Sequence, residues 1–259
     1  MPAPKPQARP ARAPIRAVAI DLDGTLLDTA GEIAAAANAM LARLGRAPAA
    51  AIDQRSLMIL LQVPSLPTAT VRDMIGNGIA NLVFKSLTAA TGQTPTPELA
   101  AHAVAIFRDC YLELLGSTAL PYPGVIAGLD RMRAMELPLA CVTNKAGFFT
   151  EMLLARTGLR ERFAHVVSGD TYEQRKPHPL PLLKTAERFG CAPHELLMIG
   201  DSLNDVLAAR AAGCPVLCVP YGYNEGAPVD GLDFDGMIID LRQACDWIEQ
   251  RSQRAASRD

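Results

Sequence analysis

Residues 17–25 are the stretch that most limits how this chain can fold. A short apolar run ends abruptly in two carboxylates, Asp21 and Asp23, followed by Gly24 and a threonine. The run is too short for a helix and contains Val and Ile, which is typical of a buried strand in a parallel sheet. Open α/β sheets hold their ligands at the carboxyl ends of such strands. Two acids there can bind a hard divalent cation and leave one carboxylate to attack a phosphoryl group.

Two other interpretations of this stretch have to be weighed. An Asp-x-Asp-Gly run is also typical of a surface turn, since Asp and Gly are the commonest turn residues. A calcium-binding loop needs glycine at its sixth position, which here is Leu26, so the sequence argues against that type of site. On these residues alone, a turn and a phosphate site remain equally open, because short motifs often match by chance.

Composition excludes several classes of protein. With 259 residues, of which 49% are hydrophobic, the chain can bury a sizeable core in one large domain or two modest ones. A net charge of −2 argues against a nucleic-acid-binding protein, which would carry a basic excess. No uninterrupted apolar run approaches the ~20 residues that span a bilayer, so we expect no membrane segment.

The cysteines and the amino-terminal residues indicate a compartment. The six cysteines form no CxxC pair, which predicts reduced thiols, mostly in the core, as in a cytoplasmic protein. They are Cys110, Cys141, Cys191, Cys214, Cys218 and Cys245. Residues 1–14 contain five prolines and lack the apolar segment of a signal peptide, which predicts a disordered tail.

Residues 30–121 carry a helical pattern in which we expect no strand. Apolar residues at helical spacing end at Gly45, and a later segment of the same kind ends near Gly92. Residues 70–73 resemble the start of a further helix. Residues 96–98, Thr-Pro-Glu, are a strong start signal that combines an N-cap, a first-turn proline and an early acid.

The rest of the chain alternates between strand and helix patterns. Candidate strands lie at residues 137–142, 165–168, 196–199, 215–219 and 237–239. Strands separated by helices of this length predict a parallel sheet, to which the strand at 17–22 must also belong. We expect an α/β fold with a Rossmann-like parallel sheet, helices on both faces and an inserted α-helical domain. The predicted boundaries are 15–29 and 122–259 for the core and 30–121 for the insert.

Three further strand ends carry polar residues suited to phosphate. Thr143 and Asn144 offer a hydroxyl and backbone N–H groups, although Thr-Asn is also a common helix N-cap. Lys176, beside a proline, suits a fixed point charge, although a solvated loop lysine is the simpler interpretation. Asp201 and Asp205 share a helix face, although acids are frequent at helix starts. Chance placement of all these groups at successive strand ends is improbable, which favours phosphoryl transfer over turns and caps.

Together these residues resemble the four motifs of the haloacid dehalogenase superfamily. The motifs correspond to residues 21–25, 142–144, 176–177 and 200–205. The resemblance covers nearly the whole chain beyond the tail, and it implies that the helical insert is a cap domain. Within the superfamily, the chain is similar to bacterial phosphoglycolate phosphatases at residues 71–78, 142–145, 169–170, 176–179 and 221–223. Residues 54–70 depart from that pattern, since they are longer and more apolar, and residues 47–70 have no readable conformation.

The resemblance implies a mechanism based on an aspartyl-phosphate. Asp21 would be the nucleophile, and Asp23 would protonate the leaving alcohol and then deprotonate the attacking water. Mg²⁺ would be bound by the Asp21 side chain, the Asp23 backbone carbonyl and Asp201. An acid at position 23 favours a phosphatase or phosphomutase over a dehalogenase or a phosphonate hydrolase.

The same resemblance assigns the phosphate ligands. Thr143, the Asn144 backbone and Lys176 would bind the remaining phosphoryl oxygens. Asp205 would orient Lys176 or a metal-bound water. Arg72, in the insert, is a candidate for binding a small carboxylate, as 2-phosphoglycolate requires, and an exposed helix charge is the equal alternative.

The resulting hypothesis is a Mg²⁺-dependent phosphatase acting on a small phosphorylated metabolite, most readily 2-phosphoglycolate. A sugar or amino-sugar phosphate phosphatase and a sugar phosphomutase are the alternatives within enzymes. A non-catalytic phosphate-binding or partner-binding module is the alternative outside enzymes, and the intact acid and lysine set argues against it. We expect a monomer or a homodimer.

Overall fold

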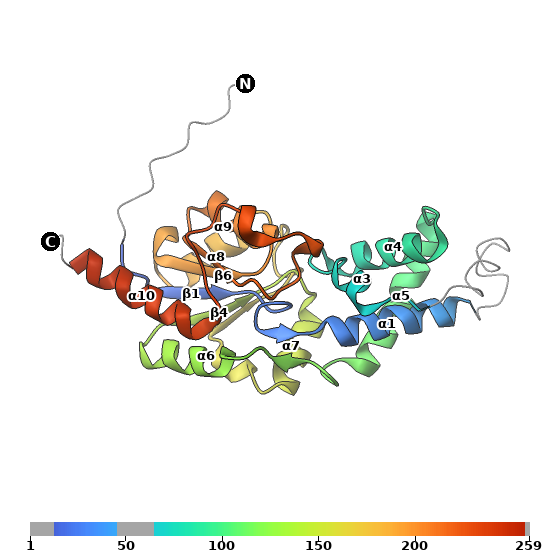
Figure 1. The fold of residues 1–259 in the computed structure, drawn as a ribbon, viewed down its shortest axis with the longest axis horizontal. Helices are drawn as coiled ribbons and strands as arrows, with labels where there is room; N and C mark the ends of the chain where they lie inside the picture. Colours follow the sequence, from blue (N-terminus) through green and yellow to red (C-terminus); the bar gives the residue numbers. More distant parts are fainter. Residues whose placement is uncertain (1–12, 46–64, 257–259) are drawn as a thin grey trace, which may run out of the picture.

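Parallel strands form the centre of the molecule. The computed structural model describes residues 13–45 and 65–256. Within them, one six-stranded sheet has the order β5-β4-β1-β6-β7-β8, and its neighbouring strands run parallel (Figure 1). Its strands are β1 (Ala17–Ile20), β4 (Leu139–Val142), β5 (His165–Val167), β6 (Leu196–Gly200), β7 (Val216–Cys218) and β8 (Gly236–Met237). The predicted α/β fold is confirmed.

The strand β1 occupies the middle of this sheet, between β4 and β6. Its side chains are fully buried on both faces, which explains why the sequence shows no polar alternation there. Val18 and Ile20 join one hydrophobic cluster, whereas Ala17 and Ala19 join another. The sheet therefore separates two apolar layers.

Helices cover both faces of the sheet, as predicted. The core helices are α6 (Val125–Ala134), α7 (Gly147–Arg156), α8 (Leu180–Arg188), α9 (Leu203–Ala212) and α10 (Leu241–Ala256). Helices α8 and α9 pack on one face, and α6, α7 and α10 on the other (Figure 1). Short 3₁₀ turns lie at Arg160–Arg162, Pro193–Glu195, Asn224–Gly226 and Val229–Gly231.

A second group of helices lies beside the carboxyl ends of the central strands (Figure 1). This helical unit comprises α1 (Ala30–Leu44), α3 (Thr68–Arg72), α4 (Gly78–Thr91) and α5 (Pro97–Leu114). The predicted start of α5 is confirmed, because the Thr96 hydroxyl accepts a hydrogen bond from the Leu99 N–H. The predicted end of α4 is confirmed as well, since Gly92 adopts a left-handed conformation with φ of 69°.

One prediction for this region is shifted and another is wrong. The helix predicted to start at residues 70–73 is present as α3, but it begins at Thr68 and has ended by Asp73, because Pro67 rather than Thr70 precedes its first turn. A strand does lie within residues 30–121, namely β3 (Leu120–Pro121), which pairs antiparallel with β2 (Leu27–Asp28). Two-residue strands carry no side-chain periodicity, so the sequence gives no signal for them. This pair holds the two chain crossings between core and helical unit side by side.

Some expectations fall on other parts of the chain. Most of the predicted tail and of the segment at residues 47–70 lies outside the described residues.

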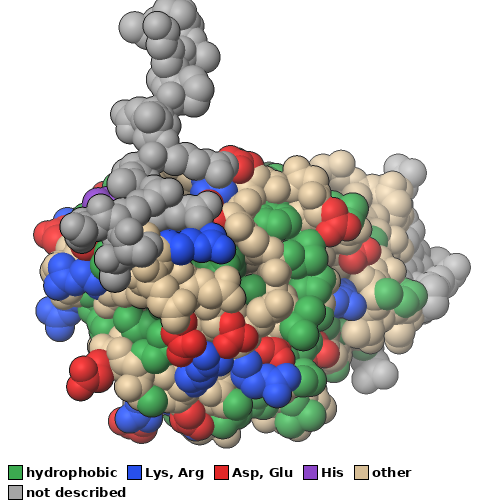
Figure 2. Space-filling model, turned by 60° about the vertical axis from the view of Figure 1, so that its left-hand side comes forward, with side chains coloured by type: hydrophobic (Ala, Val, Ile, Leu, Met, Phe, Trp, Pro, Cys, Tyr) green, Lys and Arg blue, Asp and Glu red, His purple; other side chains and the backbone are tan. Residues whose placement is uncertain are grey.

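None of the described helices combines the length and apolar character that a bilayer crossing needs. All six cysteines are free. On the face shown in Figure 2, basic side chains lie among acidic ones, in agreement with the nearly balanced net charge.

Candidate active site

Adjacent strand ends bring the acidic residues of two motifs together. The Asp21 N–H donates to the Ile199 carbonyl at 2.9 Å, so the chain leaves β1 beside the end of β6, which leads to Asp201. Gly24 then turns the chain with φ of 88°, and a Cβ atom at this position would lie 2.5 Å from Asp201 Oδ2. Glycine is thus required here both for the turn and for the close approach to the carboxylate.

Lys176 connects two of the carboxylates. Its ammonium group lies 2.9 Å from Asp21 Oδ1 and 2.7 Å from Asp205 Oδ1, and it donates to the Val142 carbonyl at 2.7 Å. The lysine side chain is 2% exposed, so these are buried, charge-assisted contacts. The sequence-predicted residues Asp21, Lys176, Asp201 and Asp205 therefore share one site.

Asp201 and Asp205 are also held by neighbouring residues of the core. Asp201 accepts hydrogen bonds from the Thr25 hydroxyl and from the Tyr223 N–H, each at 2.7 Å. Asp205 Oδ2 accepts from the Ser202 hydroxyl at 2.6 Å and from its N–H at 3.1 Å, at the start of α9. Asp21 and Asp201 line a cavity and Asp205 does not, so Asp21 and Asp201 are the better placed to take a metal ion.

The charge balance of this cluster suits a divalent cation. Asp21, Asp201 and Asp205 each place a carboxylate oxygen within 4.8 Å of the others. Burial, and after it the negative charge of Asp205, raises the pKa of Asp201 to about 6. Burial also raises the pKa of Asp21, although Lys176 lowers it. Three carboxylates against one ammonium leave two negative charges, which a hard divalent cation with oxygen ligands would neutralise. The donor set therefore fits such an ion.

Thr143 and Asn144 lie across the site, after β4. Thr143 is 4% exposed, and its hydroxyl accepts a hydrogen bond from the Lys145 N–H at 3.2 Å. The Asn144 amide donates to the Lys176 carbonyl at 2.8 Å and to the Gly76 carbonyl at 3.0 Å. Its buried Oδ1 has no partner among the described residues. Asn144 thus joins the core to the helical unit and keeps one acceptor unused.

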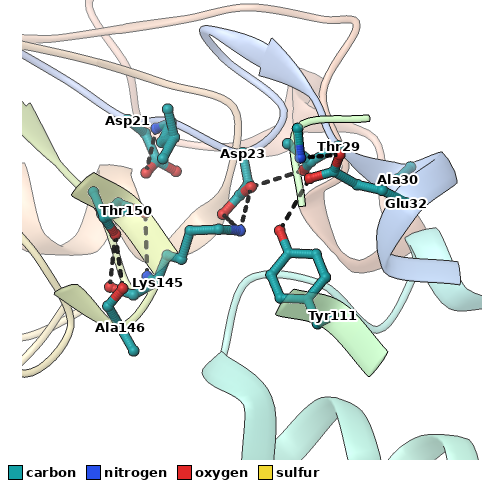
Figure 3. A network of polar contacts seen from close by, with 12 residues as sticks. Asp21, Asp23, Thr29, Ala30, Glu32, Tyr111, Lys145, Ala146 and Thr150 are labelled. Carbon is teal, nitrogen blue, oxygen red and sulfur yellow. Dashed lines mark hydrogen bonds and ion pairs between the residues drawn. The ribbon is translucent and has the colours of Figure 1, made fainter. Parts of the chain in front are cut away.

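Lys145 and Tyr111 form a second polar network, which the sequence did not reveal (Figure 3). The Lys145 ammonium lies 2.8 and 3.0 Å from the two oxygens of Asp23, and Thr29 donates to the same carboxylate at 2.7 Å. The ammonium also lies 5.0 Å from the centre of the Tyr111 ring, a cation–π contact. The Tyr111 hydroxyl donates to the buried Glu32 at 3.2 Å. Residues from core and helical unit therefore meet around Asp23.

These groups line one cavity of about 70 Å³. Its core wall includes Asp21, Asp23, Thr143, Asn144, Lys145, Lys176 and Asp201. Its helical wall includes Ile33, Ile75, Ile79, Leu82, Phe107 and Tyr111. A volume of this size holds on the order of five water molecules, at about 10–15 Å³ each. The cavity therefore suits a phosphoryl group with a small organic substituent.

Arg72, for which the sequence left a carboxylate ligand and an exposed helix charge equally open, contacts backbone carbonyls of the core. Its guanidinium donates to the carbonyls of Tyr221 and Gly222, each at 2.7 Å, and lies 5.2 Å from the centre of the Tyr223 ring. It is not among the residues that line the cavity. Its candidacy as a carboxylate ligand is therefore not favoured by this arrangement, in which it ties the helical unit to the core.

Tyr223 is a further residue that sequence reasoning missed. Its hydroxyl accepts from the N–H groups of Thr29 and Ala30 at 2.7 and 3.0 Å, and it donates to Asp28 at 2.9 Å. Its own N–H holds Asp201. The Tyr-Gly-Tyr run was noted only as part of a resemblance, because backbone contacts such as these leave no mark on residue type.

A known protein family matches most of this chain. A family model described as a haloacid dehalogenase-like hydrolase matches residues 15–213. The chain belongs to this family. This haloacid dehalogenase-like hydrolase is 50% identical over 231 residues to a phosphoglycolate phosphatase of Thiobacillus denitrificans, with 89% of this chain and 94% of that protein covered.

Two further relatives support the same family. A phosphoglycolate phosphatase of Nitrosospira multiformis is 46% identical, with 92% of this chain and 98% of that protein covered. The crystal structure of a predicted phosphoglycolate phosphatase from Haemophilus somnus superposes on this hydrolase with a TM-score of 0.79 at 27% identity. That alignment covers 90% of this chain and 97% of that one.

Proposed function

We propose that this hydrolase is a Mg²⁺-dependent phosphatase that converts 2-phosphoglycolate to glycolate and inorganic phosphate. The contact of Asp21 with Lys176, beside Asp201 in one buried cavity, is the observation that carries the proposal. The names of the relatives at 50% and 46% identity support the choice of substrate. The cavity supports it as well, because it has room for a small phosphorylated acid between the core and the helical unit.

Asp21 is the proposed nucleophile. Its carboxylate oxygen attacks phosphorus and forms an aspartyl-phosphate, while the bond to the leaving alkoxide breaks. Lys176, fixed at 2.9 Å from Asp21, supplies a positive charge to the phosphoryl oxygens, and Thr143 and the Asn144 N–H supply donors. Asp205 keeps Lys176 in place through its 2.7 Å contact.

Asp23 is the proposed general acid and base. It gives a proton to the leaving oxygen and later takes one from the water that attacks the aspartyl-phosphate, so phosphate leaves and Asp21 is restored. Its contacts with Thr29 and Lys145 hold the carboxylate in one orientation.

Asp21, Asp201 and the Asp23 carbonyl are the proposed Mg²⁺ ligands. When bound, the cation offsets the repulsion between the Asp21 carboxylate and an anionic substrate. The oxygen-only donor set and its excess negative charge support this assignment.

The helical unit is proposed to act as a cap domain of residues 30–121 on a core of residues 15–29 and 122–259. Its apolar wall excludes water from the phosphoryl group and limits the size of the leaving group. The prediction of a monomer or homodimer stays a prediction, as does the cytoplasmic location, which the six free cysteines support.

A phosphate-release screen tests the proposal. Purified protein with Mg²⁺ is offered 2-phosphoglycolate, 3-phosphoglycerate, sugar phosphates and amino-sugar phosphates, with and without EDTA. We expect the highest kcat/KM for 2-phosphoglycolate and no turnover in EDTA. Asp21→Asn is the inactive control. Higher kcat/KM for an amino-sugar phosphate would reject the substrate, and no turnover of any ester would reject the phosphatase.

A further inference from the structure

Lys145 is the residue whose surroundings carry an inference beyond the roles already assigned. Its side chain is 6% exposed, yet it lines the cavity. Among the described residues that line this cavity, Lys145 and Lys176 are the cationic ones. The two lysines differ in how many of their ammonium hydrogens already have an acceptor among the described residues.

An ammonium group has three hydrogens to donate. Lys176 has an acceptor for each of them, in Val142, Asp21 and Asp205. For Lys145, the acceptors in the described part of the chain are the two oxygens of Asp23. At least one hydrogen of Lys145 is therefore available to a molecule in the cavity.

Lys145 lies next to the place expected for the leaving group of the substrate. A general acid at Asp23 has to reach the oxygen that leaves with the organic part of the substrate. In 2-phosphoglycolate, one methylene group separates this oxygen from the carboxylate. A cation in contact with both Asp23 oxygens thus lies beside the place that the carboxylate must occupy.

The described part of the helical wall offers no alternative cation for that carboxylate. The helical residues that line the cavity, within the described chain, include no Arg or Lys, and Arg72 is held by carbonyls elsewhere. A carboxylate buried against Ile79 and Leu82 without a counter-charge would be unfavourable, because burial penalises an unpaired charge. Among the described residues, the cation available to this carboxylate belongs to the core, and the Tyr111 ring at 5.0 Å holds it in place.

We propose that Lys145 binds the carboxylate of the leaving group and so selects phosphorylated small acids over neutral phosphate esters. This inference rests on the proposed phosphatase function and names the residue that recognises the organic part of its substrate. Tyr111, and Glu32 through Tyr111, position the ammonium from the helical side (Figure 3).

Matched substrates test the proposal. 2-Phosphoglycolate and 2-hydroxyethyl phosphate differ in one group, a carboxylate in the first and a neutral CH₂OH in the second. In Lys145→Met, kcat/KM for the acid should fall about 10- to 100-fold more than for the neutral ester, the value of one charge-assisted hydrogen bond. Equal losses on both substrates would overturn the proposal, because they would mean that Lys145 only orients Asp23.

Two controls keep the test decisive. Lys184→Met removes an exposed lysine on α8 and should change neither rate. Lys145→Arg keeps the charge and should keep the preference for the acid. If Lys145→Met does not fold, the wild-type enzyme still serves: glycolate should inhibit at least about ten times more strongly than ethylene glycol. Equal inhibition would also overturn the proposal.

A longer pair separates this inference from the proposed substrate. 3-Phosphoglycerate and glycerol 3-phosphate also differ only in a carboxylate against CH₂OH. If the wild-type enzyme prefers this longer acid and Lys145→Met loses that preference, 2-phosphoglycolate is the wrong substrate and the role of Lys145 stands. If the enzyme hydrolyses 2-phosphoglycolate best and the variant keeps its preference for acids, the substrate stands and the role of Lys145 fails.

Discussion

On the core wall of the cavity, Asp21, Asp201 and Lys176 are fixed by charged and hydrogen-bonded contacts, whereas the helical wall presents mainly aliphatic and aromatic side chains. The core wall has little freedom, because each group there is held by at least one buried partner. The helical wall is shaped by packing, which tolerates changes of side-chain size at modest cost. We therefore expect the chemistry and the recognition of the carboxylate to depend on the core wall, and the size of the accepted leaving group to depend on the helical wall.

The largest effect is expected for Asp21→Asn. The amide keeps the shape of the side chain but is a poor nucleophile, so turnover with Mg²⁺ should fall at least about 10⁴-fold. The variant should still fold, because it removes one negative charge from a cluster that already carries too many. Asp130→Asn, on the surface of α6, is the matched control. Turnover within a hundredfold of wild type would show that Asp21 is not the nucleophile.

Lys176→Met should weaken the metal-free fold strongly. It leaves the buried carboxylates of Asp21 and Asp205 without their counter-charge, at a cost of about 3–5 kcal/mol in the free energy of unfolding. Denaturant titration in EDTA measures this loss in the free energy of unfolding. Lys184→Met, whose lysine is exposed, should stay within about 0.5 kcal/mol of wild type. Similar values for the two variants would mean that the core wall is not an electrostatic unit.

The pH dependence of stability should follow from Asp201. Its pKa is raised by burial from 3.8 to about 6 in the folded chain, so the metal-free fold retains a proton that the unfolded chain has lost. Stability in EDTA should therefore fall as pH rises through that interval. Added Mg²⁺ should restore stability increasingly with pH, because it binds the ionised carboxylates. Thermal unfolding at several pH values, with and without Mg²⁺, checks this. A stability in EDTA that rises with pH through that interval would contradict the prediction.

The smallest effect is expected on the helical wall. Ile79→Ala, on α4, should enlarge the cavity and raise KM for 2-phosphoglycolate by about tenfold at most, since it removes apolar contacts and no charge. For slightly larger phosphate esters, KM should rise less than this or should fall. A change in kcat of more than about a hundredfold would mean that the chemistry depends on the helical wall as well as on the core wall.

The sequence allowed the sheet to be predicted closely because buried parallel strands and their polar ends are local patterns. The strand predicted at 196–199 is observed at Leu196–Gly200, and that at 165–168 at His165–Val167. Acids and lysine at successive strand ends indicated one shared site, since parallel strands end at the same edge of a sheet. The structure does bring Asp21, Lys176 and Asp201 together.

Other features depend on contacts between distant segments. The pairing of β2 with β3 joins residues more than ninety positions apart, in strands too short to show any period. Arg72 was a candidate ligand by residue type, but two backbone carbonyls near Tyr221 occupy it. Lys145 was noted only as part of a motif, because its contact with Asp23 depends on how the loop after β4 faces the loop after β1.

By itself the sequence determined the α/β core, the helical insert and the set of groups able to perform phosphoryl chemistry. These follow from short-range patterns of burial and from residue types with few alternative uses at a strand end. Only the tertiary structure decided which lysine lies beside Asp21 and which beside Asp23, and that the helical wall carries no counter-charge in its described part. Residue type sets what a side chain can do, but its partner is set by distances of a few ångströms between segments far apart in the chain.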